Sequence, residues 1–289
     1  MKRLIKRILS VIGLDPRRCY EGVAMWSLGL AMTGDRRRMA DKLRSIVPDV
    51  SEQESSDKQF FNAYWERKRR SLQAFQCSLM LRFLEKEKPG PLTVVDIGDS
   101  AGTHMLYLRE LTKGRLDIDT ISVNLDPRAI EKIKARGLKA LHCRAEELDL
   151  KGQHVDFFTS FQMVEHLHNP AIFFHRLAKK TSVSGMIVTL PYLKTSRVGL
   201  HQIRYGNTKQ IPAEEEHIFE FCPEDWTLLF LHSGWRVSYS EISYQYPRHI
   251  PGLSWLLKLF WRHSDYEGFW GVILEKDTTF SDLYLDWEE

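Results

Sequence analysis

A short run of small and acidic residues, VVDIGDSAGTH at residues 94–104, has the types and spacing for two different chemistries. Residues Gly98 to Gly102 match G-x-S-x-G, the sharp turn at which a hydrolase presents its serine nucleophile, here Ser100. The same letters can form the first turn of a cofactor-binding sheet, in which Ser100 is a small residue close to a cofactor. A hydrolase needs several strands and an oxyanion loop before the serine. The preceding 90 or so residues are helical in pattern, so a hydrolase using Ser100 is only the alternative.

Nucleotide-binding motifs fit this run poorly. A phosphate-binding loop requires a lysine after its last glycine, where the chain has Thr103. A dinucleotide-binding G-x-G-x-x-G motif would require glycine at both Ser100 and Thr103, which disfavours NAD. What remains is an acid followed by three small residues at alternate positions: Asp96, Gly98, Ser100 and Gly102. Small residues allow an adenosyl cofactor to approach the backbone closely, and the acid can hold the ammonium group of the cofactor's amino acid tail.

In these residues the chain resembles the class I S-adenosylmethionine-dependent methyltransferases, whose first motif is commonly D/E-x-G-x-G-x-G. Serine replaces the middle glycine here. The resemblance extends over about residues 90–275 and implies that S-adenosylmethionine is the cofactor. In the family, an acid at the end of the second strand binds the ribose hydroxyls. That position falls on Asn124, with Asp126 two residues further on.

A third segment carries the same resemblance. CRAEELDL at residues 143–150 is similar to the family's D-A-E-E-L sequence after strand three. The resemblance implies that the backbone amides of Ala145 and Glu146 contact the adenine ring. Arg144 stands where the family often has an aspartate.

The fourth segment is the most specific. VDFFTSFQMVEHLHNP at residues 155–170 is similar to the strand-four segment of the small-molecule branch of the family, with its E-H-L sequence. It implies that Phe161 and Gln162 line the cofactor. It also implies that Glu165 and His166 begin a short helix that faces the methyl group.

Two histidines are the candidate catalytic residues. Methyl transfer to a hydroxyl requires a group that removes the proton, and a histidine with a near-neutral pKa suits that task. His166 is the first candidate and His217 the second. The alternatives are that His166 caps its helix or orients a loop, and that His217 is a surface residue. We expect no metal site, because the ligand spacing of EEEH at residues 214–217 together with His201 does not support one.

The elements that position these residues predict an α/β fold, a Rossmann-like seven-stranded doubly wound sheet with an N-terminal all-helical region. Short apolar runs alternate with helical patterns from Pro89 onward, which is typical of such sheets. We expect three parts: a helical region at residues 1–88, the methyltransferase domain at residues 89–277 and an acidic tail at residues 278–289. The expected strands are residues 92–98, 118–126, 138–143, 155–161, 184–192, 235–244 and 268–276.

Composition sets broad limits on the class of protein. The chain has 289 residues, 43% hydrophobic and 27% charged, with a net charge of +3, which is ordinary for a globular protein. Its four cysteines lie far apart, so no disulfide framework is indicated and a cytoplasmic setting is expected. No run reaches the length of a membrane-spanning helix.

The identity of the methyl acceptor is the feature that the sequence indicates least clearly. Residues 2–13 place apolar and basic side chains on opposite sides of a helix, the pattern of a helix in an anionic membrane interface. The alternative is that this helix docks on the domain. Together with the aromatic and basic segment at residues 246–270, it predicts a peripheral enzyme that acts on a lipid-linked acceptor. The overall pattern resembles bacterial methyltransferases of surface-polysaccharide or lipid-linked glycan pathways, which implies O-methylation of a small-molecule or lipid-linked glycan acceptor. A non-catalytic scaffold is a further alternative, and no nucleic acid partner is expected because no recognisable RNA-binding module is present.

Overall fold

The computed structural model describes residues 13–51, 62–85, 90–204, 206–211 and 216–284. The chain divides into two compact units. Unit 1 consists of Met1–Phe75 and Ile242–Phe269, and unit 2 consists of Gln76–Glu241 and Trp270–Glu289.

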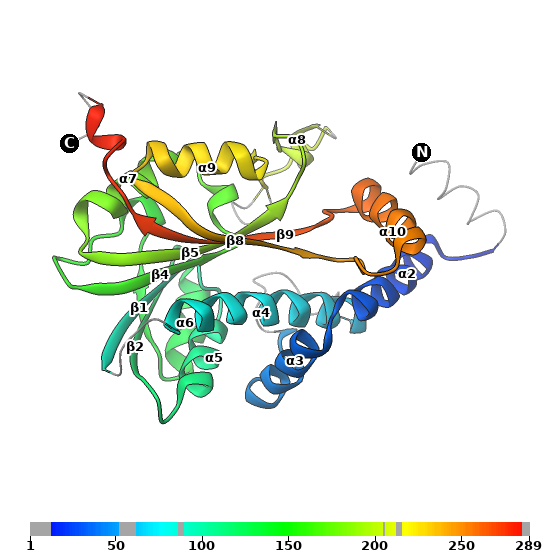
Figure 1. Cartoon of the computed structure of the whole chain (residues 1–289), viewed down its shortest axis with the longest axis horizontal. Coiled ribbons are helices and arrows are strands. Elements are labelled where there is room, and N and C mark those ends of the chain that lie inside the picture. Colours follow the sequence, from blue (N-terminus) through cyan, green and yellow to red (C-terminus); the bar gives the residue numbers. More distant parts are fainter. Residues whose placement is uncertain (1–12, 52–61, 86–89, 205, 212–215, 285–289) are drawn as a thin grey trace. The chain divides into compact units, whose positions relative to one another are not determined.

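Seven strands form one sheet in the order β3-β2-β1-β4-β5-β9-β8 (Figure 1). The pairs β1 with β2, β1 with β4, β2 with β3, and β4 with β5 are all parallel. The chain runs outward from β1 to β3 and then returns to place β4 on the other side of β1. Ligands of such sheets bind at this reversal, beyond the carboxyl ends of the strands. The bounds are β1 Pro91–Ile97, β2 Asp117–Asn124, β3 Lys139–His142, β4 Val155–Phe161, β5 Val183–Tyr192, β8 Trp235–Tyr244 and β9 Gly268–Lys276.

The central strands are nearly continuous apolar runs because parallel strands are covered on both faces. Val94 and Val95 of β1 and Phe157 and Phe158 of β4 are all fully buried. The length of each buried run therefore sets the position along the chain at which polar residues can follow the strand.

Helices cover both faces of the sheet in unit 2. Figure 1 shows α5 (Thr103–Thr112) and α6 (Pro127–Ala135) on one face, with α7 (Pro170–Lys180) and α9 (Pro223–His232) on the other. The starts of α6 and α7 follow from their sequences: Asp126 and Asn169 accept hydrogen bonds from backbone amides of the first turn, and each precedes a proline.

Shorter elements connect the main ones. The segment between β5 and α9 contains an antiparallel pair of two-residue strands and one helical turn. The described residues also include three 3₁₀ turns. The bounds are β6 Arg197–Val198, α8 His201–Arg204, β7 Phe219–Glu220, η3 Ala145–Glu147, η4 Val164–His166 and η6 Ser281–Leu283.

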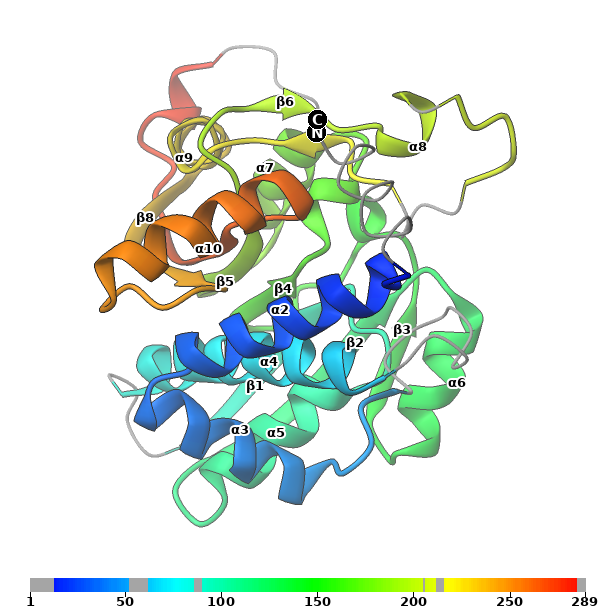
Figure 2. The same cartoon turned by 90° about the vertical axis from the view of Figure 1, so that its right-hand side faces the viewer.

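Unit 1 is helical. It contains α2 (Pro16–Ala31), α3 (Gly34–Ile46), α10 (Pro251–Ser264) and the first part of α4 (Ala63–Leu84), and α2 lies beside α10 (Figure 2). A hydrogen-bonded pair joins them, because Trp261 Nε1 donates to Ser27 Oγ at 2.9 Å. The apolar core of unit 1 consists of Ala24, Leu28, Tyr64, Tyr246, Leu257 and Trp261.

The predicted fold class is confirmed: a seven-stranded sheet flanked by helices follows a helical N-terminal region. The compact units divide the chain at other positions than the expected domains, because residues 242–269 join the N-terminal helices. The boundaries at residues 88 and 277 therefore stay predictions. Among the helices described, none combines the length and the apolar character needed to cross a membrane. The proposed interface helix lies outside the described residues, apart from Gly13.

Candidate functional site

Asp96 lies near the end of β1, where the strand order reverses. It pairs in register with Thr159 of β4, whose Oγ1 donates to Asp96 Oδ1 at 2.8 Å. The side chain is 2% exposed, and its Oδ2 is buried and accepts no hydrogen bond from any described residue. Burial, together with the nearby Asp99 carboxylate, holds the pKa of Asp96 well above its ordinary value. Asp96 Oδ2 is therefore suited to receive a cationic group such as an ammonium.

The turn after β1 requires glycine at two of its three small positions. Gly98 has a φ of +92°, and a Cβ there would lie 2.5 Å from Met163 Cγ. Gly102 caps α5 with a φ of +73°, and a Cβ there would lie 2.4 Å from Leu138 Cδ1. Ser100 is half-buried between them and is not among the described non-glycine residues with a positive φ. A positive φ is a sign of backbone strain, so Ser100 does not show the strain expected of the elbow that presents a hydrolase nucleophile.

Asp99 holds the turn together and was not singled out from the sequence. Its Oδ1 accepts from the backbone amides of Ala101 at 3.1 Å and Gly102 at 2.7 Å. Its Oδ2 accepts from Ser122 Oγ of β2 at 2.7 Å. Burial raises the pKa of Asp99 despite these bonds. An aspartate followed by small residues is a signal for such a local turn, but the bond to Ser122 is a tertiary contact.

Asn124 and Asp126 were the two candidates for the ribose. Asn124 Nδ2 donates to the carbonyl of Asp99 at 2.9 Å, and its Oδ1 accepts from the amide of Asp126 at 2.7 Å. Asp126 caps α6 and forms an ion pair with Arg128 at 3.1 Å. The side-chain amide of Asn124 thus connects the turn after β1 with the turn after β2, next to the reversal of the strand order. Ribose binding by either residue stays a prediction.

Ala145 and Glu146 lie in η3, after β3. Both are half-buried. Arg176 of α7 donates from Nη1 to the carbonyl of Glu146 at 3.0 Å, which anchors this turn to the helix layer. The expected contact of their amides with adenine stays a prediction.

Phe161 is the last residue of β4 and Gln162 follows it, and both belong to a network that sequence reasoning missed. Gln162 adopts a φ of +55°, which is uncommon for a residue other than glycine and is often found at functional sites. Gln162 and Gln76 of α4 both donate to Thr189 Oγ1 of β5, at 3.3 and 3.0 Å. Gln76 Oε1 is 2.8 Å from His104 Nε2, and the His104 ring lies 4.7 Å from that of Phe161.

This network brings His104 close to Asp96. The Nδ1 atom of His104 is 3.9 Å from Asp96 Oδ2. The network therefore joins the ends of β1, β4 and β5. Gln76 and Thr189 come from segments more than 100 positions apart, and nothing in the local sequence indicates that they meet.

Glu165 and His166 belong to η4, a single turn that begins at Val164 and ends at His166, whereas the resemblance implied a short helix beginning at Glu165. That this turn faces the methyl group stays a prediction. Glu165 is fully buried, and neither of its carboxylate oxygens accepts a hydrogen bond from a described residue. His166 Nδ1 lies 3.0 Å from the carbonyl oxygen of Glu216. This bond orients the chain before β7. Orienting a loop was one of the two alternatives to a catalytic role for His166.

His217 is brought to the same place by the β6–β7 ribbon. The amide of Ile218 donates to the carbonyl of Glu165 at 2.8 Å, and the amide of Leu200 donates to the carbonyl of His217 at 2.8 Å. The rings of His166 and His217 are perpendicular, with centroids 4.7 Å apart. Each of Glu165, His166 and His217 offers one potential ligand atom, and these three atoms lie within 4.8 Å of one another.

The electrostatic environment of His217 is negative. Burial lowers its pKa, but the Glu220, Glu165 and Glu216 carboxylates outweigh burial, so the pKa of His217 is raised above 6.5. His217 is half-buried, so the alternative that it is a surface residue is not favoured.

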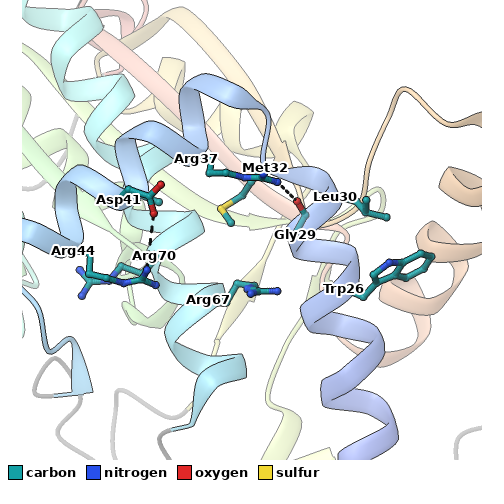
Figure 3. A pocket seen from close by; sticks show the side chains of 10 residues that line it. Trp26, Gly29, Leu30, Met32, Arg37, Asp41, Arg44, Arg67 and Arg70 are labelled. Atoms are coloured by element: carbon teal, nitrogen blue, oxygen red, sulfur yellow. Dashed lines mark hydrogen bonds and ion pairs between the residues drawn. The ribbon is translucent and has the colours of Figure 1, made fainter.

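A pocket of about 440 Å³ lies in unit 1, between α2, α3 and α4 (Figure 3). It is rich in arginine, but contacts inside the unit engage these side chains. Arg37 donates to the carbonyl of Gly29 at 3.0 Å, Arg67 to that of Met25 at 3.1 Å, and Arg44 pairs with Glu66 at 3.1 Å. We interpret the arginines as structural. None of the predicted cofactor residues lines this pocket.

Fold and site together define a class of protein. A doubly wound sheet, an acid with an unsatisfied buried oxygen at the reversal and a turn of small residues are the features of a class I S-adenosylmethionine-dependent methyltransferase. Residues 64–240, which are more than half of the chain, match the family described as a methyltransferase domain. The chain belongs to this family, and S-adenosylmethionine is its cofactor.

Solved structures share the fold. A putative sarcosine dimethylglycine methyltransferase from Galdieria sulphuraria is 11% identical with a TM-score of 0.52, over 84% of this chain and 98% of that one. The 1,6-didemethyltoxoflavin-N1-methyltransferase of Burkholderia thailandensis is 13% identical with a TM-score of 0.52, over 85% and 92%. At these identities the likeness concerns the fold alone. No curated protein matches the chain.

Proposed function

We propose that this protein O-methylates a small-molecule acceptor that carries a hydroxyl group. The observation that supports this proposal is the meeting of Glu165, His166 and His217 directly after β4, beyond the strand ends that carry the cofactor residues. When bound, S-adenosylmethionine supplies an electrophilic methyl carbon and becomes the neutral thioether. A hydroxyl must lose its proton to attack that carbon, whereas a neutral amine attacks with its own lone pair. A carboxylate and two imidazoles at one place therefore favour a hydroxyl acceptor.

The other residues hold the reactants. Asp96 Oδ2 receives the ammonium group of the cofactor, and the proposed ribose ligands are Asn124 and Asp126. The amides of Ala145 and Glu146 face the adenine ring in this proposal. Phe161 and Gln162 separate the cofactor from the acceptor side, where His166 and His217 take up the acceptor proton.

The first experiment is calorimetric titration with S-adenosylmethionine and S-adenosylhomocysteine, with Asp96→Ala for comparison. We expect micromolar binding that the variant loses. Folded protein that binds neither ligand would favour the non-catalytic scaffold instead.

The second experiment separates acceptor classes. Formation of S-adenosylhomocysteine is measured with panels of hydroxylated compounds and of amines, for the wild type and for His166→Ala and His217→Ala. Loss of proton transfer typically costs about 10²- to 10⁴-fold in rate, so we expect losses of that size with unchanged cofactor affinity. Turnover of amines alone would contradict O-methylation.

We further propose a lipid-linked glycan as the acceptor, with a cytoplasmic enzyme attached peripherally to the membrane through residues 2–13. The described part of unit 1 supports a membrane contact, because large apolar side chains are exposed there: Trp255 is 61% exposed, Leu256 58% and Trp26 51%. Aromatic side chains of this kind favour the membrane interface.

Flotation with anionic liposomes tests this attachment. The full chain is compared with a truncation lacking residues 1–15 and with Trp255→Ala combined with Leu256→Ala. We expect both changes to reduce flotation, whereas Leu228→Ala, which removes an exposed leucine of α9, should not. Equal flotation of all four proteins would exclude the attachment.

A further inference from the structure

We propose that Glu165, His166 and His217 bind a divalent transition-metal ion, for which Zn²⁺ is the best match, and that this ion holds and acidifies the acceptor hydroxyl. The proposal departs from the sequence-based expectation of no metal. The ligand set considered from the sequence combined His217 with His201, whereas the cluster in the structure combines His217 with Glu165 and His166. The role toward the acceptor rests on the proposed function, but metal binding itself does not.

Glu165 is the first observation in favour of a cation. Its side chain is 0% exposed, and no described residue donates a hydrogen bond to either carboxylate oxygen. A buried carboxylate is normally paired with a cation, coordinated to a metal or hydrogen-bonded, because isolated burial of the charge is costly. The backbone carbonyl of Glu165 accepts the amide of Ile218 at 2.8 Å, which connects this turn to the chain that carries His217. A bound cation would satisfy both oxygens.

The polar partners of the two histidine Nδ1 atoms are the second observation. The partner of His166 Nδ1 is a carbonyl oxygen, which only accepts, so Nδ1 carries the proton. His217 Nδ1 faces Glu220 Oε1 at 3.4 Å, so the same assignment follows. In the neutral rings the lone pair then lies on Nε2. Histidines that bind metals are oriented in this way, through a hydrogen bond from the other ring nitrogen to a carbonyl or carboxylate.

The support behind these ligands extends further. Glu220 is held in place by Arg197, its neighbour across the β6–β7 ribbon. Glu216, whose carbonyl orients His166, accepts the amide of Gln202 on its carboxylate at 2.9 Å. The carboxylates of Glu165, Glu216 and Glu220 add negative charge near the cluster, which favours a dication.

The donor set selects the kind of ion. Two imidazoles and one carboxylate suit Zn²⁺ or another first-row transition metal, whereas Mg²⁺ and Ca²⁺ prefer oxygen ligands alone. Three protein ligands leave coordination positions for an exogenous oxygen. Methyl transfer involves no redox change, so a Lewis acid is sufficient. The acceptor O–H bond breaks with its proton passing to solvent, the O–CH₃ bond forms, and the C–S bond breaks with its electron pair staying on sulfur.

The test measures metal in the absence of cofactor and acceptor. Tag-free full-length protein is stripped with a chelator, equilibrated with Zn²⁺ and dialysed, and its metal content is determined by mass spectrometry. The affinity is measured by competition with a chromophoric chelator. Glu165→Gln and His217→Ala remove ligands, Glu220→Gln removes a support, and His154→Ala, whose side chain is 59% exposed, is the matched control.

We expect about one equivalent of Zn²⁺ in the wild type and in His154→Ala, as for a single three-ligand site. Loss of the supporting carboxylate should weaken affinity roughly 10- to 100-fold, and loss of a ligand should weaken it more. Circular dichroism checks that each variant is folded. No Zn²⁺ retained by the wild type, or equal affinity in wild type and folded His217→Ala, would overturn the proposal.

The role toward the acceptor has its own readout. If O-methylation is observed, stripping should abolish it and Zn²⁺ should restore it, without a change in cofactor affinity. Activity that survives complete stripping would overturn this role and leave His166 and His217 as direct proton acceptors. Zn²⁺ bound by a protein that methylates no hydroxyl would contradict the proposed function while supporting the metal site.

Discussion

At the scale of single residues, Asp96 combines a proposed role in cofactor binding with an expected cost in stability. Its charge is buried and Oδ2 has no donor among the described residues. In Asp96→Asn the bond from Thr159 can persist, but the charge that attracts the ammonium is lost. We expect cofactor affinity to fall roughly 10- to 100-fold, the size of a hydrogen bond to a charged group. Calorimetric titration measures this change, and unaltered affinity would remove Asp96 from the site.

The same substitution should stabilise the cofactor-free protein. The pKa of Asp96 is raised on folding, so between its ordinary value of 3.8 and the raised value the folded state holds more protons than the unfolded state. The free energy of unfolding therefore falls as pH rises through this window, and below 3.8 the cost vanishes. We expect Asp96→Asn to gain about 1–3 kcal/mol at neutral pH, the cost of an unsatisfied buried group, and nothing at low pH. Denaturant unfolding at several pH values gives the comparison.

Cofactor binding should depend on pH for the same reason. The ammonium group of the cofactor favours ionised Asp96, so affinity should weaken as pH falls through the raised pKa of the free protein. Titration from neutral to acidic pH should show this decline in the wild type and a flatter profile in Asp96→Asn. Matching profiles would assign the pH dependence to another group, such as Asp99 or His104.

Gly98 is a position where backbone and packing both require glycine. Gly98→Ala would place a methyl group 2.5 Å from Met163 Cγ at a φ of +92°. Left-handed backbone and overpacking together should cost roughly 2–5 kcal/mol. Unfolding by denaturant gives the value. Met163→Ala removes Cγ but keeps a Cβ that would lie 2.8 Å from the new methyl group. Compared with Met163→Ala alone, Gly98→Ala in that background should therefore cost less than in the wild type, and an equal cost would mean that the clash with Cγ contributes nothing.

At the scale of elements, Arg70 of α4 fixes the end of α3. Its guanidinium is almost fully buried and donates to the carbonyls of Leu43, Val47 and Pro48, at 3.4, 2.6 and 2.7 Å. These include carbonyls that no turn of α3 can satisfy. Arg70→Met would remove the donor to the carbonyl of the buried Val47, while Leu43 would keep the amide of Val47 as its donor. An unsatisfied buried carbonyl, together with the loss of this buried anchor, should cost roughly 2–5 kcal/mol. Circular dichroism during denaturation measures the loss. Arg37→Met, which removes one exposed bond to Gly29, should cost far less.

The elements differ in how clearly the sequence indicates them. The strands at the centre of the sheet were predicted within a few residues, because buried apolar runs are local signals. The β6–β7 ribbon was not predicted. Two-residue strands carry no periodicity, and their pairing depends on contacts between residues about 20 positions apart.

At the scale of the whole molecule, the cofactor should stabilise the fold through unit 2, which contains all of the predicted cofactor residues. A ligand that binds only the folded state at about 100 times its Kd adds about 2.7 kcal/mol. We expect thermal unfolding to shift upward with S-adenosylhomocysteine in the wild type and much less in Asp96→Asn at the same concentration. An equal shift in both would place the stabilising site elsewhere.

The sequence by itself determined the fold class, the first strand of the sheet and the small residues of the turn after it. Burial, capping and the need for small residues act over a few neighbouring positions, so they can be read along the chain. Only the tertiary structure decided which residues meet. Gln76, His104 and Thr189 come together from three elements, and Glu165 and His217 meet through an unpredicted ribbon. Contacts at such separations depend on how strands and connections pack, and single-chain periodicity does not encode this. Residues 242–269 likewise pack with the N-terminal helices, although they follow the sheet in sequence.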